Sequence, residues 1–410
     1  MTTTIQRTTK NWTRLIFIVA VSLSACNLSL VKDTPTPTPI SSPPTQIPTS
    51  TPEYSDEFLR VAGTSLIYKG QTVYLKGVNF NNQTALKIRT DTINYGDGKT
   101  SDINYTEADY ERLAQMGGNH VRWGISFNWY KDDRNNFFQV LDQHIAWARK
   151  YNLWLVLNLF TFPDDCYEGY TYQCPYWNDT NLQQELLDFW VDVARHYKNE
   201  PVIAGYDLIN EPTPPKPGGN KMWLSLAQKI RDAIYLVDSN HLVFVEFDSS
   251  GKDLGLLVGD NIVYSIHIYA PLALTHADGP TDFSYPGYIP DNGIPVWWDK
   301  SSMSKDGTHR SSIRTRYAIE WTEENNIPIY IGEFGARAWV DGYLQYLEDL
   351  IDLFDSWNLH YAYFVWRAKS YEDFGIYPLR DSLDPWSKER EALLTSKLKG
   401  SIKPNFTGTP

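Results

Sequence analysis

The chain has 410 residues, of which 42% are hydrophobic and 14% aromatic, and it carries a formal net charge of -12. This length and apolar content allow one large domain with a sizeable core. The negative charge disfavours nucleic acids and anionic lipid surfaces as partners and leaves neutral or cationic ligands.

The first 25 residues have the pattern of a secretory signal. Basic residues precede an apolar run, Leu15–Leu23, which suits the hydrophobic region of a signal peptide and is too short to span a membrane. The stretch Leu23-Ser24-Ala25-Cys26 resembles the lipobox of bacterial lipoproteins, which implies cleavage before Cys26 and a lipid on its sulfur. The alternative is that Cys26 is a small residue within a signal that is removed.

A polar tether is predicted over residues 26–54. From Asp33 to Pro52 the chain alternates Thr, Pro and Ser, a composition that buries no core and favours extended conformations. Residues 55–410 then form one predicted domain, exported and held at the cell surface or released outside the cell.

Strand-like and helix-like segments alternate through residues 55–410, which is typical of a parallel sheet with crossover helices. A hairpin comes first, over Leu66–Leu75 with its turn at Lys69-Gly70-Gln71, and is expected to close the floor of a barrel. Eight strands are then predicted at Leu75–Phe80, Asn119–Ile125, Leu153–Phe160, Val202–Asn210, Leu242–Phe247, Ile262–Tyr269, Pro328–Glu333 and Tyr361–Arg367.

Amphipathic helices are predicted between most of these strands. Asp179-Thr180-Asn181 and Ser311-Ser312 offer N-caps for two of them. The helices are expected at Thr106–Met116, Phe138–Tyr151, Leu182–Tyr197, Trp223–Val237 and Ile313–Glu324. Eight strands with crossover helices predict an α/β fold, the (β/α)8 TIM barrel, whose functional residues lie at the carboxyl ends of the strands.

Cys166 and Cys174 lie close together in a loop rich in Tyr, Asp and Gly. In an exported protein such a pair, without a flanking His or third Cys, is more typical of a disulfide than of a metal site. Two free thiols are the alternative. The eight His residues show no metal-binding spacing, and no glycine-rich phosphate loop follows a strand. We therefore predict neither a metal nor a cofactor.

Two predicted strands end in a carboxylate, in the segments Tyr206–Pro212 and Ile329–Gly335. Burial beside apolar neighbours raises the pKa of a carboxyl group unless partners compensate. One such Glu is more simply a solvated residue at the start of a loop, but Glu211 and Glu333 share the same context. Two carboxyl groups pointed at one place can serve as acid and nucleophile, as glycoside hydrolysis requires.

Five other polar or aromatic side chains also lie at the ends of predicted strands: Arg122, Asn210, His267, Tyr269 and Trp366. Here the sequence resembles glycoside hydrolase family 5, the cellulase-type retaining glycosidases, from residue 69 through to residue 366. The resemblance makes residues 55–410 a catalytic domain and requires no cofactor. Its most specific motifs are Asn210-Glu211-Pro212, His267-Ile268-Tyr269 and Gly332-Glu333-Phe334-Gly335.

The resemblance implies that Glu211 is the acid/base and Glu333 the nucleophile. It assigns supporting roles to five further residues: Asn210 binds the sugar 2-hydroxyl, Arg122 and Tyr269 hold Glu333 ionised, His267 tunes proton exchange at Glu211, and Trp366 forms the floor beneath the reacting sugar. Each of four residues has a simpler explanation when taken singly. Asn210 would be a loop cap, Arg122 a surface charge, His267 a hydrogen-bonded core His and Trp366 a packed core Trp.

Two positions depart from the family pattern. Many members have a His at the end of strand three, where this chain has Phe160, so a contact to a substrate hydroxyl is missing or supplied elsewhere. The stretch Pro271–Asp278 is similar to a longer Thr-His motif of some members but differs around that pair. His276 is therefore either a substrate contact or a surface His.

These features predict a monomeric, lipid-anchored retaining β-glycosidase that acts on a β-linked polysaccharide, with an endo-β-1,4-glucanase as the first expectation. The alternatives are an exo-acting or other-linkage enzyme, such as a β-1,3-glucanase or a β-mannanase, and a carbohydrate-capture lipoprotein without activity. The presence of both Glu residues argues against the last. Four loop aromatics are expected to stack along an extended sugar chain: Tyr176, Trp177, Trp297 and Trp298.

Overall fold

The computed structural model describes residues 55–80, 105–161, 174–215, 218–247, 255–304, 310–368, 372–379 and 382–406. All of these belong to the compact unit Tyr54–Pro410. The predicted signal peptide, the tether, Cys26 and Cys166 lie outside the described residues. Among the helices that the structure does describe, none is both long enough and apolar enough to cross a membrane.

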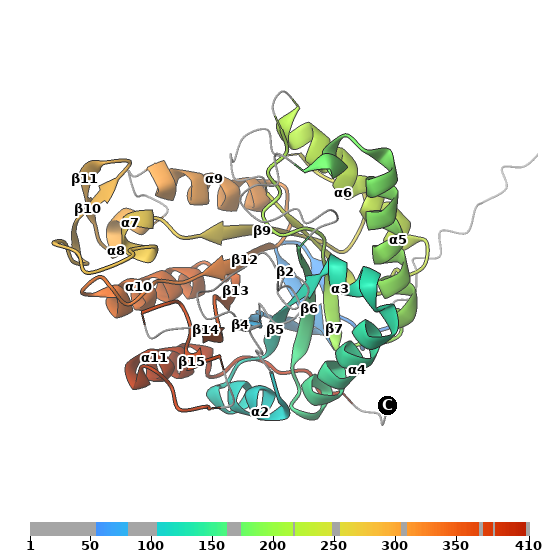
Figure 1. Ribbon diagram of the computed structural model, residues 1–410, viewed down its shortest axis with the longest axis horizontal. Coiled ribbons are helices and arrows are strands. Elements are labelled where there is room, and N and C mark those ends of the chain that lie inside the picture. Colours follow the sequence, from blue (N-terminus) through green and yellow to red (C-terminus); the bar gives the residue numbers. More distant parts are fainter. Residues whose placement is uncertain are drawn as a thin grey trace, which may run out of the picture. The chain divides into compact units, whose positions relative to one another are not determined.

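Eight parallel strands close into a barrel, with helices around it (Figure 1). Each strand pairs with its neighbour in chain order, and the last pairs with the first. The strands are β4 (Lys76–Phe80), β5 (His120–Ser126), β6 (Trp154–Thr161), β7 (Ile203–Asp207), β8 (Leu242–Glu246), β9 (Ile262–Ile268), β12 (Ile329–Phe334) and β13 (His360–Tyr363). The predicted (β/α)8 TIM barrel is confirmed.

At three strands the observed end comes early enough to place site residues beyond the strand. β7 stops at Asp207, so Asn210 and Glu211 lie in the segment that follows the strand. β9 stops at Ile268, one residue before Tyr269. β13 stops at Tyr363, and Trp366 lies between it and the short strand β14 (Arg367–Ala368), which pairs with β15 (Tyr377–Pro378).

The helix Thr180–Tyr197 shows how the helices pack on the barrel, because it buries an apolar stripe that includes Leu186, Phe189 and Val193. Asp179 caps this helix, α5, through hydrogen bonds from two backbone amides, as its sequence predicts. Ser311 and Ser312 are not caps, because α9 already begins at Arg310. The helices are α2 (Glu107–Met116), α3 (Phe127–Asp132), α4 (Arg134–Lys150), α5 (Thr180–Tyr197), α6 (Gly219–Tyr235), α9 (Arg310–Glu324), α10 (Tyr343–Ser356) and α11 (Lys388–Leu398).

A small antiparallel sheet closes the amino end of the barrel. It consists of β1 (Arg60–Ala62), β2 (Ser65–Tyr68) and β3 (Gln71–Val73). Its apolar side chains, including Leu66 and Val73, share one buried cluster with barrel residues such as Trp154 and Phe244. The predicted floor is thus observed, and the polar residues gather at the opposite, carboxyl end of the strands.

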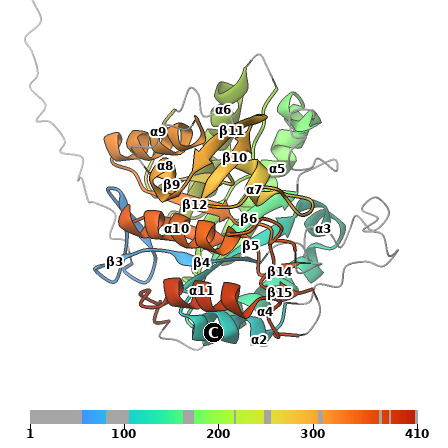
Figure 2. The same ribbon diagram turned by 90° about the vertical axis from the view of Figure 1, so that its left-hand side faces the viewer.

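A second hairpin lies outside the barrel, formed by β10 (Gly287–Asp291) and β11 (Ile294–Trp298). Both views place it beside two short helices, α7 (Leu272–Thr275) and α8 (Lys300–Met303) (Figures 1 and 2). One face of the hairpin is buried through Ile289 and Trp298. The other face exposes Tyr288 and Trp297, which are paired across the strands.

Candidate active site

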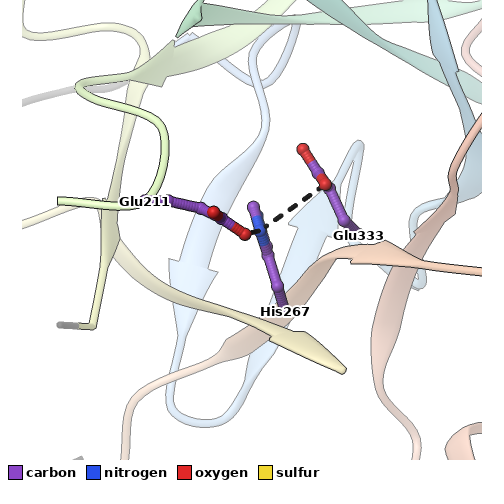
Figure 3. Close-up of side chains that lie close together, drawn as sticks. All are labelled: Glu211, His267 and Glu333. Atoms are coloured by element: carbon purple, nitrogen blue, oxygen red, sulfur yellow. Dashed lines mark hydrogen bonds and ion pairs between the residues drawn. The ribbon is translucent and has the colours of Figure 1, made fainter. Parts of the chain in front are cut away.

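Glu211 and Glu333 approach each other at the carboxyl end of the barrel, with His267 between them (Figure 3). One oxygen of each carboxylate and one nitrogen of the imidazole lie within 4.8 Å of one another. The Nδ1 atom of His267 is 2.8 Å from Oε1 of Glu211 and 3.6 Å from Oε2 of Glu333. The two carboxyl groups predicted from the sequence therefore form one cluster.

The two carboxylates differ in their access to solvent. The side chain of Glu333, on β12, is only 3% exposed, whereas that of Glu211 is 31% exposed. Glu211 also has a positive φ of 45°, a conformation that costs a non-glycine residue about 1–2 kcal/mol. A neighbouring group must hold this backbone in place.

Both oxygens of Glu333 accept a hydrogen bond. Nη1 of Arg122 donates to Oε1 at 2.8 Å, and the hydroxyl group of Tyr269 donates to Oε2 at 2.8 Å. These are the two residues that the family resemblance assigns to Glu333. Their contacts fix the plane of the carboxylate.

The family resemblance implies that Arg122 and Tyr269 keep Glu333 ionised by lowering its pKa. The structure shows the opposite net direction. Burial raises the pKa of Glu333 above its ordinary value, and the carboxylates of Glu211 and Glu246 add to the rise. His267 and Arg122 oppose it without cancelling it. The cause is that removal from water penalises the ionised form more than the two cations compensate.

Arg122 is the centre of the polar layer and is almost fully buried, at 1% exposure. Its guanidinium group lies inside the barrel, where carboxylate and amide oxygens from four other strands or strand ends surround it. It donates to Asn79 (3.1 Å), Asp207 (2.8 Å), Asn210 (2.8 Å), Glu246 (2.6 Å) and Glu333 (2.8 Å). The bond to Oδ1 of Asn210 orients that side-chain amide.

Sequence reasoning missed two buried acids in this layer, Glu246 and Asp207. Glu246 ends β8, and although burial raises its pKa, His267, Arg122 and the Glu211 amide together lower it. Burial raises the pKa of Asp207 to about 7, against the opposing effect of Arg122. The available signal was an acidic residue at the end of an otherwise apolar strand.

The acidic neighbours of His267 favour its cationic form. Burial alone lowers the pKa of an imidazole, but Glu246, Glu333 and Glu211 together raise the pKa of His267 well above its ordinary value. An imidazolium has no lone pair for a metal ion. Glu211, His267 and Glu333 are close enough to hold a metal ion, which would compete with this proton for the imidazole nitrogen.

His276 and Phe160, the two positions that depart from the family pattern, lie on the segment after β9 and on β6. His276 is exposed, its Nδ1 is 2.9 Å from the hydroxyl oxygen of Thr275, and its ring packs edge-on against Tyr269 with 5.0 Å between centroids. This places His276 next to a residue that contacts Glu333. Phe160, on β6, is 9% exposed and brings an apolar ring to the end of that strand.

The predicted aromatic platforms need correction. Trp366 is fully buried, and its indole N–H donates to Asp109 at 2.7 Å, so it presents no open floor to a sugar. Tyr176, Trp177 and Trp298 are at most 2% exposed and pack in the core. Of the four loop aromatics, Trp297 alone is open to solvent, at 47% exposure.

A (β/α)8 barrel that ends in two facing carboxylates defines the class of the protein as a glycoside hydrolase. A family model described as cellulase (glycosyl hydrolase family 5) matches residues 70–370. The chain therefore belongs to glycosyl hydrolase family 5.

Individual relatives are similar at modest identity. Endoglucanase 3 of Fibrobacter succinogenes is 28% identical over 343 residues, which are 70% of this chain and 49% of that protein, so the chain spans about half the length of this relative. Endoglucanase C of Acetivibrio thermocellus is 27% identical over 332 residues, 72% of this chain and 92% of that protein.

A solved structure with the same fold is that of the endoglucanase Cel5A from Thermotoga maritima. It has a TM-score of 0.59 and 21% sequence identity, and the match covers 78% of this chain and 96% of that one. At this identity the likeness supports the shared barrel and no finer property.

Proposed function

We propose that this chain is a retaining endo-β-1,4-glucanase in which Glu333 is the nucleophile and Glu211 the acid/base. The observation that carries this proposal is the approach of the two carboxylate oxygens to within 4.8 Å. Retaining enzymes hold their carboxyl groups about 5 to 5.5 Å apart, whereas inverting enzymes need about 6.5 to 9.5 Å to admit a water molecule.

In the first step, Glu333 attacks the anomeric carbon and Glu211 protonates the departing glycosidic oxygen. Arg122 and Tyr269 hold the two oxygens of Glu333, so the nucleophile is positioned before the substrate arrives. Glu211, with its partly exposed side chain, can reach the leaving group and the incoming water. The product of this step is a covalent glycosyl-enzyme.

In the second step, Glu211 acts as a base and removes a proton from water, which attacks the anomeric carbon and releases Glu333. His267 contacts Glu211 and lies near Glu333, so its positive charge accompanies the change of charge on both carboxylates. Asn210, held by Arg122, is proposed to bind the sugar 2-hydroxyl as positive charge develops on the ring.

A β-1,4-glucan substrate is supported by the endoglucanases among the relatives and by the negative charge of the chain, which suits a neutral polymer. Tyr288 and Trp297 offer exposed rings on one face of a hairpin, where apolar sugar faces can stack. Phe160 supplies an apolar surface, so reading of a sugar hydroxyl at that point is relaxed. His276 is proposed as a further substrate contact beside Tyr269.

The setting of the enzyme is proposed from the sequence. A lipid on Cys26 anchors the exported chain to a membrane, and residues 26–54 space a monomeric catalytic domain from it. Cys174 is 4% exposed, and we propose that it pairs with Cys166 in a disulfide.

The test of this function is the product profile and anomeric configuration on defined substrates. Soluble β-1,4-glucan should be cut internally, with a rapid loss of viscosity and with β-configured new ends observed by proton NMR. Mannan, xylan and β-1,3-glucan should react more slowly. Release of single sugars or disaccharides without loss of viscosity supports the exo-acting alternative, and an absence of hydrolysis with retained binding supports the capture protein.

A further inference from the structure

Glu246 contacts three parts of the site at once, although its position has no role in the mechanism above. Its side chain is 3% exposed and lies at the end of β8. Oε1 accepts a hydrogen bond from Nη2 of Arg122 at 2.6 Å and lies 3.2 Å from Nε2 of His267. Oε2 accepts the backbone N–H of Glu211 at 2.7 Å.

The hydrogen bond from the Glu211 amide to Glu246 stabilises a backbone conformation that is unfavourable for a non-glycine residue. Glu211 adopts a left-handed conformation with a φ of 45°, and the hydrogen bond from its N–H to a buried carboxylate is charge-assisted and therefore strong. Because the side chain of Glu211 projects from this backbone, the position of its carboxyl group depends on Glu246.

The contact to His267 fixes the other side of the same carboxyl group. The Nε2 atom of the imidazolium forms an ion pair with Oε1 of Glu246 at 3.2 Å, while its Nδ1 donates to Oε1 of Glu211 at 2.8 Å. Since Oε1 accepts this hydrogen, the proton that Glu211 transfers is carried on its other oxygen, Oε2. The charged groups gathered around His267 are Glu211, Glu246, Glu333, Asp207 and, through Glu246, Arg122.

We propose that Glu246 is a positioning residue for the acid/base. One of its oxygens holds the main chain of Glu211, and the other holds the His267 imidazolium that directs the acidic proton to Oε2 of Glu211. This inference rests on the proposed function, because it assumes that Glu211 is the acid/base.

The experiment compares Glu246→Gln with Glu200→Gln on two aryl β-cellobiosides, one with a good leaving group and one with a poor one. Glu200 is a matched control, because its carboxylate also accepts a guanidinium, that of Arg149, and a backbone amide, that of Val202, but lies at the amino end of β7. Acid assistance matters only where the leaving group is poor.

Glu246→Gln should therefore lower kcat/KM for the poor leaving group by about tenfold or more, and that for the good leaving group much less. The high-pH limb of its activity profile should move to lower pH by about one unit, since a negative charge beside His267 and Glu211 is removed. Glu200→Gln should leave both the ratio of the two rates and the pH profile as in the wild type.

Histidine-labelled protein gives a second measurement by nitrogen NMR, with the His267 signal assigned from a His267→Gln variant. In Glu246→Gln, His267 should lose its proton at lower pH than in the wild type. Should Glu246→Gln fail to fold, the same readings apply to Glu246→Asp, which keeps the charge but withdraws it and should show the leaving-group effect with a smaller pH shift.

Equal losses on both aryl substrates with an unmoved pH profile would overturn the positioning role and leave Glu246 as a structural residue. The proposed function is tested separately on the wild type. If the wild-type products keep the β configuration and Glu333→Ala is inactive, the proposed function stands. A failure of the Glu246 prediction then concerns Glu246 alone.

Discussion

Tyr269 donates its hydroxyl hydrogen to Oε2 of Glu333 at 2.8 Å, on the side of the carboxylate that Arg122 does not reach. Burial raises the pKa of Glu333, and a phenol donor favours the ionised form that attacks the sugar. Tyr269 therefore works against the effect of burial.

Tyr269→Phe should accordingly reduce kcat by about 10- to 100-fold, the effect of a lost hydrogen bond to a charged group. Activity disappears as the pH falls through the pKa of Glu333, and loss of the donor raises that pKa. The low-pH limb of kcat/KM should thus move to higher pH. A limb that stays in place would show that Tyr269 does not act on the ionisation of Glu333.

Glu333→Ala and Glu211→Ala should differ in kind. Without Glu333 no glycosyl-enzyme forms, so all substrates should become inert. Without Glu211 the loss should be about 10²- to 10⁴-fold on poor leaving groups and small for the first step on good ones. Added azide should restore turnover of Glu211→Ala by attacking the accumulated intermediate. Full activity of Glu333→Ala on any substrate would contradict the assignment.

Asp207 gives a prediction for stability. Its pKa in the folded state is raised to about 7 from 3.8. The protonated form of Asp207 therefore adds to the free energy of unfolding at low pH, and this contribution is lost as the pH rises toward about 7. Asn at this position does not titrate. The wild type should therefore lose stability between about pH 4 and pH 7 relative to Asp207→Asn. The difference in unfolding free energy between the two proteins should become smaller over this range. Urea unfolding across this range measures it, and a difference that grows with pH contradicts the direction.

Trp297 tests the exposed hairpin face. Trp297→Ala should raise KM for soluble β-1,4-glucan about fivefold, which corresponds to about 1 kcal/mol, and leave aryl cellobiosides unaffected because these reach only the reacting sugars. Tyr317→Ala is the control, since Tyr317 on α9 has the same 47% exposure as Trp297. An equal effect of both variants, or none, removes the hairpin from substrate binding.

Cys26 tests the anchor. Wild-type protein in the producing cell should partition into detergent, and Cys26→Ala should be released or misprocessed. Firm anchoring needs more than one acyl chain, as a diacylglyceryl group supplies. Wild-type protein that stays entirely in the aqueous phase would refute the lipid.

The barrel and the paired Glu residues were predictable because their signals are local. Each strand is a short apolar run, and Glu211 and Glu333 come at the ends of such runs in matching contexts. Arg122, His267 and Tyr269 occupy strands or strand ends, where the closure of the barrel brings them together. Periodicity predicted the barrel, whereas the roles of these residues came from the family resemblance that the motifs carry.

Side-chain burial was less predictable, because it depends on contacts between distant segments. Trp366 lies in the core, where its indole N–H donates a hydrogen bond to Asp109, a residue more than 250 positions away in the sequence. Glu246 is part of the site only because Arg122, from β5, and His267, on the neighbouring strand β9, both approach its carboxylate. No local pattern distinguishes such an acid from one that merely ends a strand, so the polar layer emerged from the three-dimensional arrangement.

The central claim is tested most directly by trapping the covalent intermediate. A 2-deoxy-2-fluoro β-cellobioside with a good leaving group slows the second step more than the first, so the glycosyl-enzyme should accumulate. Peptide mass spectrometry of the trapped protein should find one added fluorocellobiosyl group on Glu333. Attachment to another residue would contradict the account. So would the absence of any attachment together with glucan products of inverted anomeric configuration.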